Sequence, residues 1–345
     1  MTAVGRVDLA RTYRITDGLG GFPADEDLGV DGYLSGGAQR MATLAGLQRS
    51  FAHAEDLLRE LSGWELDDNT IRKITHQTAR RAAAERPERA DAARFAAAEG
   101  VPEVTIDAGK VNTMTGWRDI KIALLSKRIP GDPASPAAWD TRTLPDPTVR
   151  TVVAAIEGVE AFTTRVRTET DRLGLTTAPN TTVLADGGEW IWNLVALVLP
   201  LAAGVLDIYH ALKSLADAIQ TIWGTTPDAE RLRAEATTAL VSGGKAGIDA
   251  WIASAIAAVP TGQSTDALLA TAGYLAAHPH HLDYAGRLAR GESIGSGQVE
   301  GAVKELVNLR LKRTGARWRV EHVGPLVELI ALSSTPEWND LWTAA

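Results

Sequence analysis

The chain has 345 residues, enough for one large domain or two to three smaller ones, and its 45% hydrophobic residues allow a sizeable core. It contains no cysteine, which excludes disulfides, thiolate chemistry and every cysteine-based zinc site. The net charge of −8 argues mildly against nucleic acid as a partner, although local charge matters more than the total.

Two segments of the chain are nevertheless strongly basic. Residues 72–94 contain seven Arg or Lys against three Asp or Glu, and residues 290–319 have the same balance. The start of the chain has no apolar secretory segment. The apolar stretch 190–206 is interrupted by Pro200 and Gly204, so we expect a buried helix followed by a buried strand there and no membrane span. These features indicate a cytoplasmic protein without membrane contact.

The first part of the chain divides into an arm and a helical region. Residues 1–34 are rich in Gly, Asp and Pro without a clean period, and we interpret them as a loose N-terminal arm. Residues 35–98 show helical patterns, with one helix predicted at 38–47 and a second at 51–61. The spacing predicts that one face of the second helix is buried through Ala54, Leu57, Leu58 and Leu61.

A turn separates the second helix from a third, basic one. Ser62-Gly63 is a C-cap signal, and the run Asp67–Asn69 offers N-caps for a helix from about Thr70. Two interpretations stay open. The pair is either a helix-turn-helix that binds DNA, with phosphate contacts from Arg72, Lys73 and Arg80, or an ordinary helical hairpin with a solvated basic face.

From residue 101 the pattern changes to short strands alternating with helices, which predicts a mixed, helix-rich α/β fold. A strand is expected at 101–107, ending at Asp107, and a second at 119–129. The Pro- and Asp-rich stretch 130–148 is predicted to be a loop, followed by a helix at 149–173.

The second half of the chain is predicted to be mainly helical. Residues 181–186 form an expected strand that ends at Asp186, directly before a helix, and 204–210 form another before a helix from about Ala211. Residues 227–290 and 296–313 show only helical patterns. The tail is also predicted to be helical and to pack on the core through Leu326, Leu329, Ile330, Trp338 and Trp342.

Three carboxylates have the surroundings that a metal site needs. Asp107 and Asp186 each stand at the end of a short apolar strand, which holds a side chain rigidly, and nearby glycines leave room for a metal and a substrate. Glu300 lies among glycines near the start of a predicted helix. Oxygen ligands suit Mg²⁺ or Mn²⁺, and two such ions would activate a water or a 3′-hydroxyl and stabilise the leaving oxygen of a phosphodiester.

The residues by themselves leave a simpler interpretation open. Asp186-Gly187 is also a turn signal in which Asp186 caps the following helix. Glu300 alone would be an ordinary solvated residue of a helix. The spacing between the three acids does not decide between these interpretations.

Longer motifs in a fixed order carry a family resemblance. In chain order they are TIDAGKV, GWRDIK, LADGGEWIWN, VLDIYHAL, IGSGQVEGAVKELVNLRLKRTGARW and EWNDLW. Together they resemble the ISKra-type insertion-sequence transposases, which are relatives of the Mutator-like group. The resemblance covers about residues 20–343.

This resemblance implies a ribonuclease-H-like core with an Asp-Asp-Glu triad. Asp107 matches the first acid, Asp186 the second and Glu300 the third, and together they would hold two Mg²⁺ or Mn²⁺ ions. The core would consist of residues 101–223 and 291–345, with an all-helical insertion at 224–290 that accounts for the strandless stretch. Residues 35–98 would form a helical DNA-binding region in front of this core.

Further residues have supporting roles in this scheme. Asp207 and His210 match the family's Asp-x-x-His element and would act near the metal or the DNA, although a satisfied buried histidine is the alternative. Lys304 would bind the scissile phosphate or neutralise Glu300, one helical turn before it. Arg118 would contact a phosphate or be a plain surface charge. The densest positive charge, and with it further DNA contacts, is expected at Arg310, Lys312, Arg313, Arg317 and Arg319.

The implied function is a DDE transposase that cuts and rejoins DNA at the nucleoid. Its partners would be the element's terminal repeats and a target duplex, joined by a homodimer or a larger synaptic complex. Family members often carry paired cysteines near the N-terminus, but YRITDGLGGFP has none, so no N-terminal zinc module is expected. Two alternatives stay open: a catalytically silent DNA-binding remnant that regulates, and another ribonuclease-H-like nuclease acting on RNA–DNA hybrids.

Overall fold

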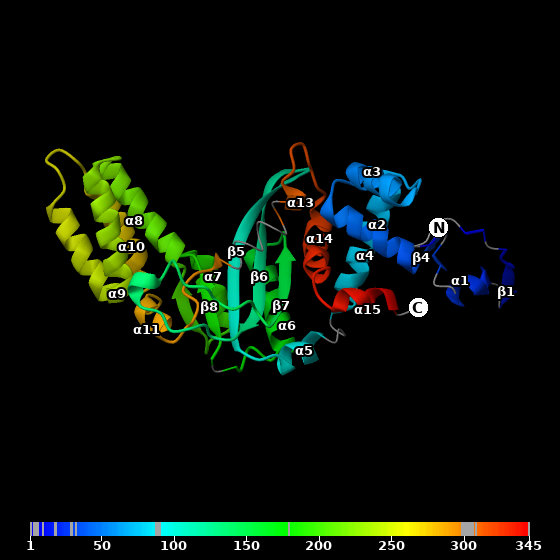
Figure 1. Ribbon diagram of the computed structural model, residues 1–345, viewed down its shortest axis with the longest axis horizontal. Helices are drawn as coiled ribbons and strands as arrows, with labels where there is room; N and C mark the ends of the chain where they lie inside the picture. Colours follow the sequence, from blue (N-terminus) through cyan, green and yellow to red (C-terminus); the bar gives the residue numbers. More distant parts are fainter. Residues whose placement is uncertain are drawn as a thin grey trace.

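The computed structural model describes residues 2, 7–8, 10–16, 19–27, 30–31, 33–86, 91–178, 180–297, 307 and 309–343. The molecule is elongated, with a helical body at one end, a sheet in the middle and the N-terminal helices at the other end (Figure 1). No helix in the described part of the chain is long and apolar enough to cross a membrane.

A five-stranded mixed sheet forms the centre, which confirms the predicted mixed α/β class. Its strands are β5 (Val101–Thr113), β6 (Gly116–Arg128), β7 (Val149–Ala155), β8 (Thr182–Ala185) and β9 (Ala203–Leu206), in the order β7-β6-β5-β8-β9. The first three form an antiparallel meander, whereas β8 and β9 run parallel to β5.

Three sequence predictions about this sheet were wrong. The predicted helix at 149–173 is β7 followed by α6 (Val159–Arg172), because a short apolar run has no period that separates strand from helix. β5 does not end at Asp107 but continues to Thr113, since β6 pairs with it along its whole length. β9 ends at Leu206, and Ile208–His210 form the first turn of α8 (Ile208–Trp223).

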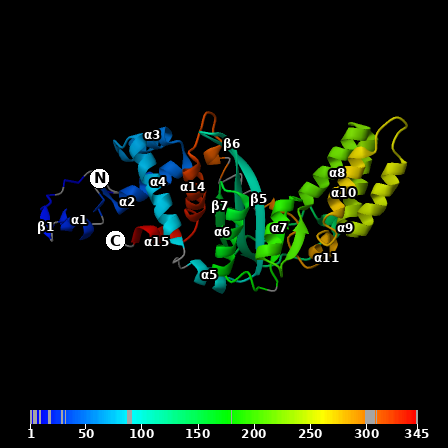
Figure 2. The same ribbon diagram turned by 180° about the vertical axis from the view of Figure 1, so that it is seen from behind.

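Helices cover both faces of the sheet. α6 and α7 (Glu189–Val198) lie side by side on one face (Figure 2), where their apolar side chains pack with Ile106, Ala123 and Ala185. On the other face, α14 (Val320–Leu332) and α4 (Asp68–Ala84) cover the meander and bury alternate residues such as Ile122. This alternation of side chains along each strand separates the two cores.

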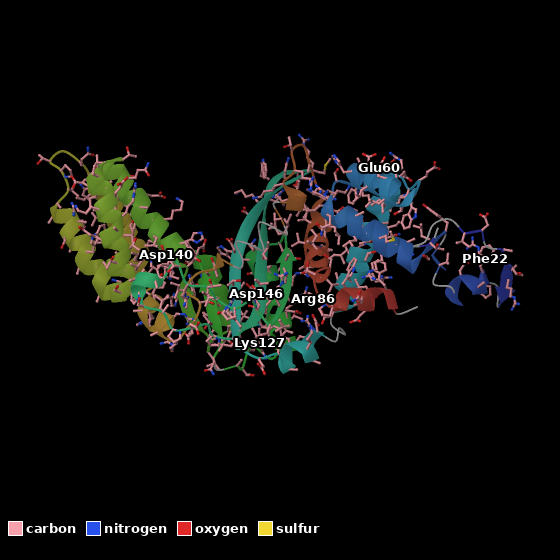
Figure 3. The ribbon with its side chains drawn as sticks, in the orientation of Figure 1. Phe22, Glu60, Arg86, Lys127, Asp140 and Asp146 are labelled. Carbon is pink, nitrogen blue, oxygen red and sulfur yellow. The ribbon has the colours of Figure 1, made fainter. Side chains whose placement is uncertain are left out.

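A helical body packs on the parallel end of the sheet. It comprises α8, α9 (Pro227–Ala257), α10 (Asp266–Ala276) and α11 (Tyr284–Ala289), and its core includes Leu184 and Leu206. Residues 227–290, all of which are described, form helices and turns without a strand, as predicted. The loop 130–148 crosses from the sheet to this body, with Asp146 near the strands and Asp140 near the helices (Figure 3).

The N-terminal region contains more regular structure than the predicted loose arm. Short strands pair as β1 (Arg14–Thr16) with β2 (Leu19–Gly21) and β3 (Val30–Asp31) with β4 (Leu34–Ser35), and α1 (Pro23–Asp27) lies between the pairs. α2 (Gly36–Gln48) and α3 (Phe51–Ser62) follow. The remaining C-terminal helices are α13 (Leu309–Leu311) and α15 (Glu337–Thr343), together with α14.

The predicted helix boundaries in this region are confirmed, but one predicted face is not. Gly63 ends α3 in the left-handed conformation at φ 63°, and the Asp67 carboxylate caps α4 by accepting the Thr70 N–H at 3.0 Å. Leu57 and Leu61 were expected to be buried, yet 39% and 76% of their surfaces are exposed. Only Ala54 and Leu58 of that face reach the core, because α3 lies over α2 and α4 on a narrow stripe.

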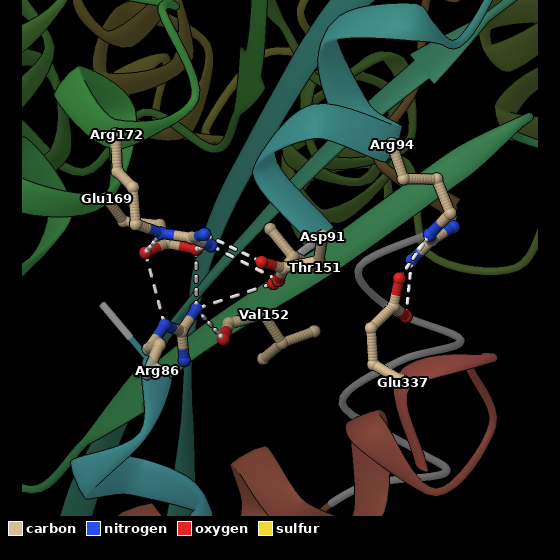
Figure 4. Close-up of polar contacts among 8 residues, drawn as sticks. All are labelled: Arg86, Asp91, Arg94, Thr151, Val152, Glu169, Arg172 and Glu337. Atoms are coloured by element: carbon tan, nitrogen blue, oxygen red, sulfur yellow. Dashed lines mark hydrogen bonds and ion pairs between the residues drawn. The ribbon is translucent and has the colours of Figure 1, made fainter. Parts of the chain in front are cut away.

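A buried ionic network joins the N-terminal helices to the outer strand of the sheet (Figure 4). Arg86, which follows α4, contacts Glu169 of α6 at 3.0 Å and Glu328 of α14 at 3.1 Å. Arg172 contacts the same Glu169 at 2.7 Å and Asp91 at 2.6 Å. Burial alone would raise the pKa of Glu169, but hydrogen bonds and charge from Arg172 and Arg86 lower it to about 2.

We expect Glu169→Gln to lower the free energy of unfolding by about 3 kcal/mol at pH 7, because it leaves two arginines buried with one negative charge fewer. The folded pKa lies below the ordinary 4.5, so the contribution is present above pH 4.5 and is lost as the pH falls toward 2. Urea unfolding between pH 7 and 3 measures both effects.

The matched control is Glu235→Gln, which breaks an exposed pair with Arg231. Its cost should be far smaller than that of Glu169→Gln and should not change with pH, because solvent screens an exposed pair. Equal, small losses for both variants would show that the network does not stabilise the fold.

Candidate active site

The sheet places two of the predicted acids side by side. β5 and β8 pair in parallel, with Ile106 opposite Ala185. Asp107 is the next residue of β5, and Asp186 directly follows the end of β8. Neighbouring strands lie about 4.8 Å apart. The two acids are therefore neighbours at the ends of adjacent strands, although 78 residues lie between them in the sequence.

Both acids lie outside the core that the residues before them form. Ile106 and Ala185 pack in the core beneath α6 and α7. Because successive side chains of a strand point to opposite faces, Asp107 points away from that core. Asp186, just beyond the end of β8, lines a groove together with His210 and Tyr274 of the helical body. On the face to which Asp107 points, α14 covers the meander and the helical body covers β8 and β9.

The backbone around each acid fixes its carboxylate. Asp186 Oδ1 accepts the Gly188 N–H at 2.8 Å, and the Asp186 carbonyl accepts Trp192 Nε1–H at 2.9 Å. Asp107 Oδ1 accepts the Ala108 N–H at 2.6 Å. Asp186 thus makes the turn contact that its sequence also suggested, and both half-buried carboxylates hold a defined direction.

Asp207 is a third acid at the same edge, but its carboxylate is fully occupied by the protein. It follows β9, which pairs with β8, and its surface is 0% exposed. Oδ1 caps α8 by accepting the His210 N–H at 2.9 Å and contacts His210 Nδ1 at 3.1 Å. Oδ2 accepts both the N–H and the hydroxyl of Ser296. Burial would raise the pKa of Asp207, but hydrogen bonds from His210 and Ser296 lower it.

The contact with Ser296 fixes the segment that returns from the helical body. Ser293 in this segment donates to Glu103 of β5, and the Ile294 carbonyl accepts the Ile208 N–H at 3.1 Å. Glu103 forms a buried ion pair with Arg128 at 3.2 Å. The chain is therefore held against the parallel strands as far as Ser296, a role for this residue that no sequence pattern indicated.

Glu300 and Lys304, which follow this segment, lie outside the described residues. Within the described part of the chain, no three His, Asp or Glu side chains are grouped so as to hold a metal ion. Of the three predicted acids, Asp107 and Asp186 belong to the described residues.

A groove of about 500 Å³ opens beside Asp186. His210 and Lys213 of α8 and Tyr274 of α10 line it. A Cβ at Gly187 would lie 2.0 Å from the Tyr274 ring, so only glycine allows this close approach. Burial, followed by the negative charge of Asp186, raises the pKa of Tyr274 to about 12. The sequence did not single out Tyr274, because a tyrosine within a helix carries no motif.

The predicted phosphate-binding residues divide into exposed and buried ones. Arg313 is half-buried and donates to the Gln48 carbonyl at 3.3 Å. Arg310 was expected to face DNA, but it is 4% exposed and lies 4.7 Å from the ring centres of both Phe51 and Trp318. The buried guanidinium therefore stabilises the packing and does not face the solvent, where DNA would bind. The exposed residues are Arg72, Lys73, Arg80, Arg118, Lys312, Arg317 and Arg319.

The fold brings the two basic segments of the sequence together. His76 of α4 stacks on His322 of α14 with ring centres 4.1 Å apart. Burial lowers the pKa of His322, and the charges of Arg80, Arg319 and Arg72 lower it further. Arginines from both segments thus lie near one histidine pair.

No protein-family model matches this chain, and no curated protein matches it either.

We expect Asp207→Asn to lower the free energy of unfolding by about 2 kcal/mol, because an amide has only one accepting oxygen and cannot serve both Ser296 and the His210 N–H. Ser296→Ala should cost about 1–2 kcal/mol, and the double variant should cost less than the two losses together. Urea unfolding of the three variants measures this coupling.

Asp283→Asn is the control, because Asp283 caps α11 in the same way but is exposed. Asn caps helices as well as Asp does, so this change should be nearly neutral. If the losses in the Asp207 and Ser296 variants were additive, the two residues would not stabilise the fold through their mutual hydrogen bonds.

Proposed function

We propose that this chain is a DDE-type DNA transposase that cleaves a phosphodiester and then joins the freed 3′-hydroxyl to target DNA. The observation that carries the proposal is that Asp107 and Asp186 each follow the last residue pair, Ile106 and Ala185, of two adjacent parallel strands. If the two aspartates were independent turn residues, nothing would require them to come together from distant parts of the chain or to lie beside a groove.

The topology of the sheet supports a ribonuclease-H-like core. An antiparallel meander of three strands, extended from its first strand by two parallel strands, is the arrangement that such a core has. The helical body lies between β9 and the C-terminal helices in the chain, where the family resemblance implies an insertion. The fold class and the positions of both aspartates are therefore consistent with one another.

The donor set fits a hard divalent cation. Carboxylate oxygens are the ligands that Mg²⁺ and Mn²⁺ prefer, and Asp107 and Asp186 supply two of them from the ends of one paired stretch of the sheet. Bound there, such ions would lower the pKa of an attacking water and stabilise the leaving oxygen. Glu300 is the proposed third ligand. It follows the anchored Ser296 by four residues, which an extended chain spans in about 14 Å at most.

The other residues would position DNA. His210 and Lys213 line the groove beside Asp186, where a protonated or ammonium group would meet a phosphate. Asp207 would act as a positioning residue, because its carboxylate is already used by Ser296 and His210. The exposed arginines of α4 and of the C-terminal segment would bind the duplex. Because two DNA ends must be joined together, we expect a homodimer or a larger complex. This complex would act at the nucleoid.

We expect Asp186→Asn and Asp107→Asn each to reduce Mg²⁺-dependent cleavage by at least about 10³-fold while DNA affinity is retained, because these groups act on the reacting phosphate and not on the duplex. The substrate is a supercoiled plasmid that carries the DNA flanking the gene on both sides. Gel analysis of nicked, linear and joined products measures the reaction.

Asp228→Asn, an exposed acid in the first turn of α9, is the control and should cleave like the wild type. Cleavage at the wild-type rate by Asp186→Asn would refute the proposal. DNA binding without cleavage by the wild-type protein would favour a regulatory remnant, and a preference for RNA–DNA hybrids would favour a different nuclease.

A further inference from the structure

The hairpin between β5 and β6 ends in an exposed apolar tip. Met114 and Trp117 have 64% and 62% of their surfaces exposed, although both are large and apolar. Met114 lies in the turn that joins β5 and β6, the two longest strands of the sheet, and Trp117 is the second residue of β6. An exposed tryptophan of this kind marks a surface that contacts something else.

The tip is built rigidly. The Thr113 hydroxyl donates to the Gly116 carbonyl at 2.6 Å, and it accepts the Thr115 N–H at 3.2 Å. Gly116 has a φ of 101°, which favours glycine. The Met114 N–H donates to the Trp318 carbonyl at 2.8 Å, so the C-terminal segment braces the hairpin. A braced tip loses little conformational entropy when it binds a partner.

Positive charge surrounds the apolar tip. Arg118 follows Trp117 and is exposed, and Arg317 and Arg319 flank the bracing Trp318 and are exposed too. Nearby acids do not cancel this charge. Asp119 is paired with Lys110 at 3.0 Å, and Glu321 is the one exposed acid of the described segment 309–322. Arg72 and Arg80 of α4 lie near the same stacked histidines as Arg319.

We infer that the β5–β6 tip is a second DNA contact, in which Trp117 and Met114 lie against bases or deoxyriboses and Arg118, Arg317 and Arg319 bind the flanking phosphates. This inference rests on the proposed function and specifies how its DNA is held. Aromatic and apolar side chains between cationic ones match the alternation of base and phosphate in DNA.

The position of the tip relative to the acids sets the spacing on DNA. Thr113 lies six residues after Asp107 in β5, and a strand rises about 3.3 Å per residue, which gives about 20 Å. DNA rises about 3.4 Å per base pair. The tip therefore contacts the duplex about six base pairs from the cleaved phosphate when the DNA follows β5.

Fluorescence anisotropy in EDTA, with a labelled duplex of about 30 base pairs taken from the DNA flanking the gene, tests this contact without any cleavage. Trp117→Ala combined with Met114→Ala should weaken binding roughly 10-fold and leave its salt dependence unchanged. Arg317→Ala and Arg319→Ala should each lower the slope of log affinity against log salt by about one. Trp117→Phe alone should keep most of the wild-type affinity, because an aromatic ring remains at the tip.

Leu201→Ala is the matched control, because Leu201 is 60% exposed and lies far from the tip. It precedes β9, an edge strand that runs parallel to β5 and so begins at the other end of the sheet. It should bind like the wild type. Wild-type affinity in the Trp117→Ala, Met114→Ala variant would overturn the inference and leave the proposed function standing. A smaller sedimenting species in that variant, with unchanged affinity, would assign the tip to self-association instead. Failure of the wild-type protein to bind any duplex would contradict the proposed function itself.

Discussion

The parallel pairing of β5 with β8 is the constraint on which the proposed chemistry depends. It fixes the register that places Ile106 opposite Ala185, and so brings Asp107 and Asp186 together. A shift of one residue would turn one aspartate into the core beneath α6 and α7. The buried side chains of that core, among them Val104 and Val183, resist such a shift because they would have to enter the opposite face.

Asp207 extends the same organisation to a third strand. It begins α8, and through Ser296 it holds the segment that leaves the helical body. One carboxylate thus links the two ends of the helical body, the start of α8 and the segment that follows α11. The helical body also carries Tyr274, which packs against Gly187 beside Asp186, so the position of Tyr274 depends on this link as well. The helical body accordingly shapes the groove as well as connecting two parts of the core.

The sequence predicted what local chemistry determines and missed what pairing determines. Cap residues such as Gly63 and Asp67 predicted helix ends, because they act within a single turn. The strand β7 was taken for a helix, since only its pairing with β6 distinguishes the two. Arg310 looked like a surface charge in a basic run, yet two aromatic rings from distant segments enclose it. Ser296 and Tyr274 gave no local signal at all, because their roles arise from contacts with Asp207 and Gly187.

The most direct test of the central claim is to locate the cation. Fe²⁺ in place of Mg²⁺, with ascorbate and peroxide, generates radicals that cut the backbone next to the bound ion. We expect cuts beside residues 107 and 186 that excess Mg²⁺ suppresses and that are lost in the variant carrying both Asp107→Asn and Asp186→Asn. Cuts confined to other regions, or cuts that persist in the double variant, would show that these two acids do not form a metal site.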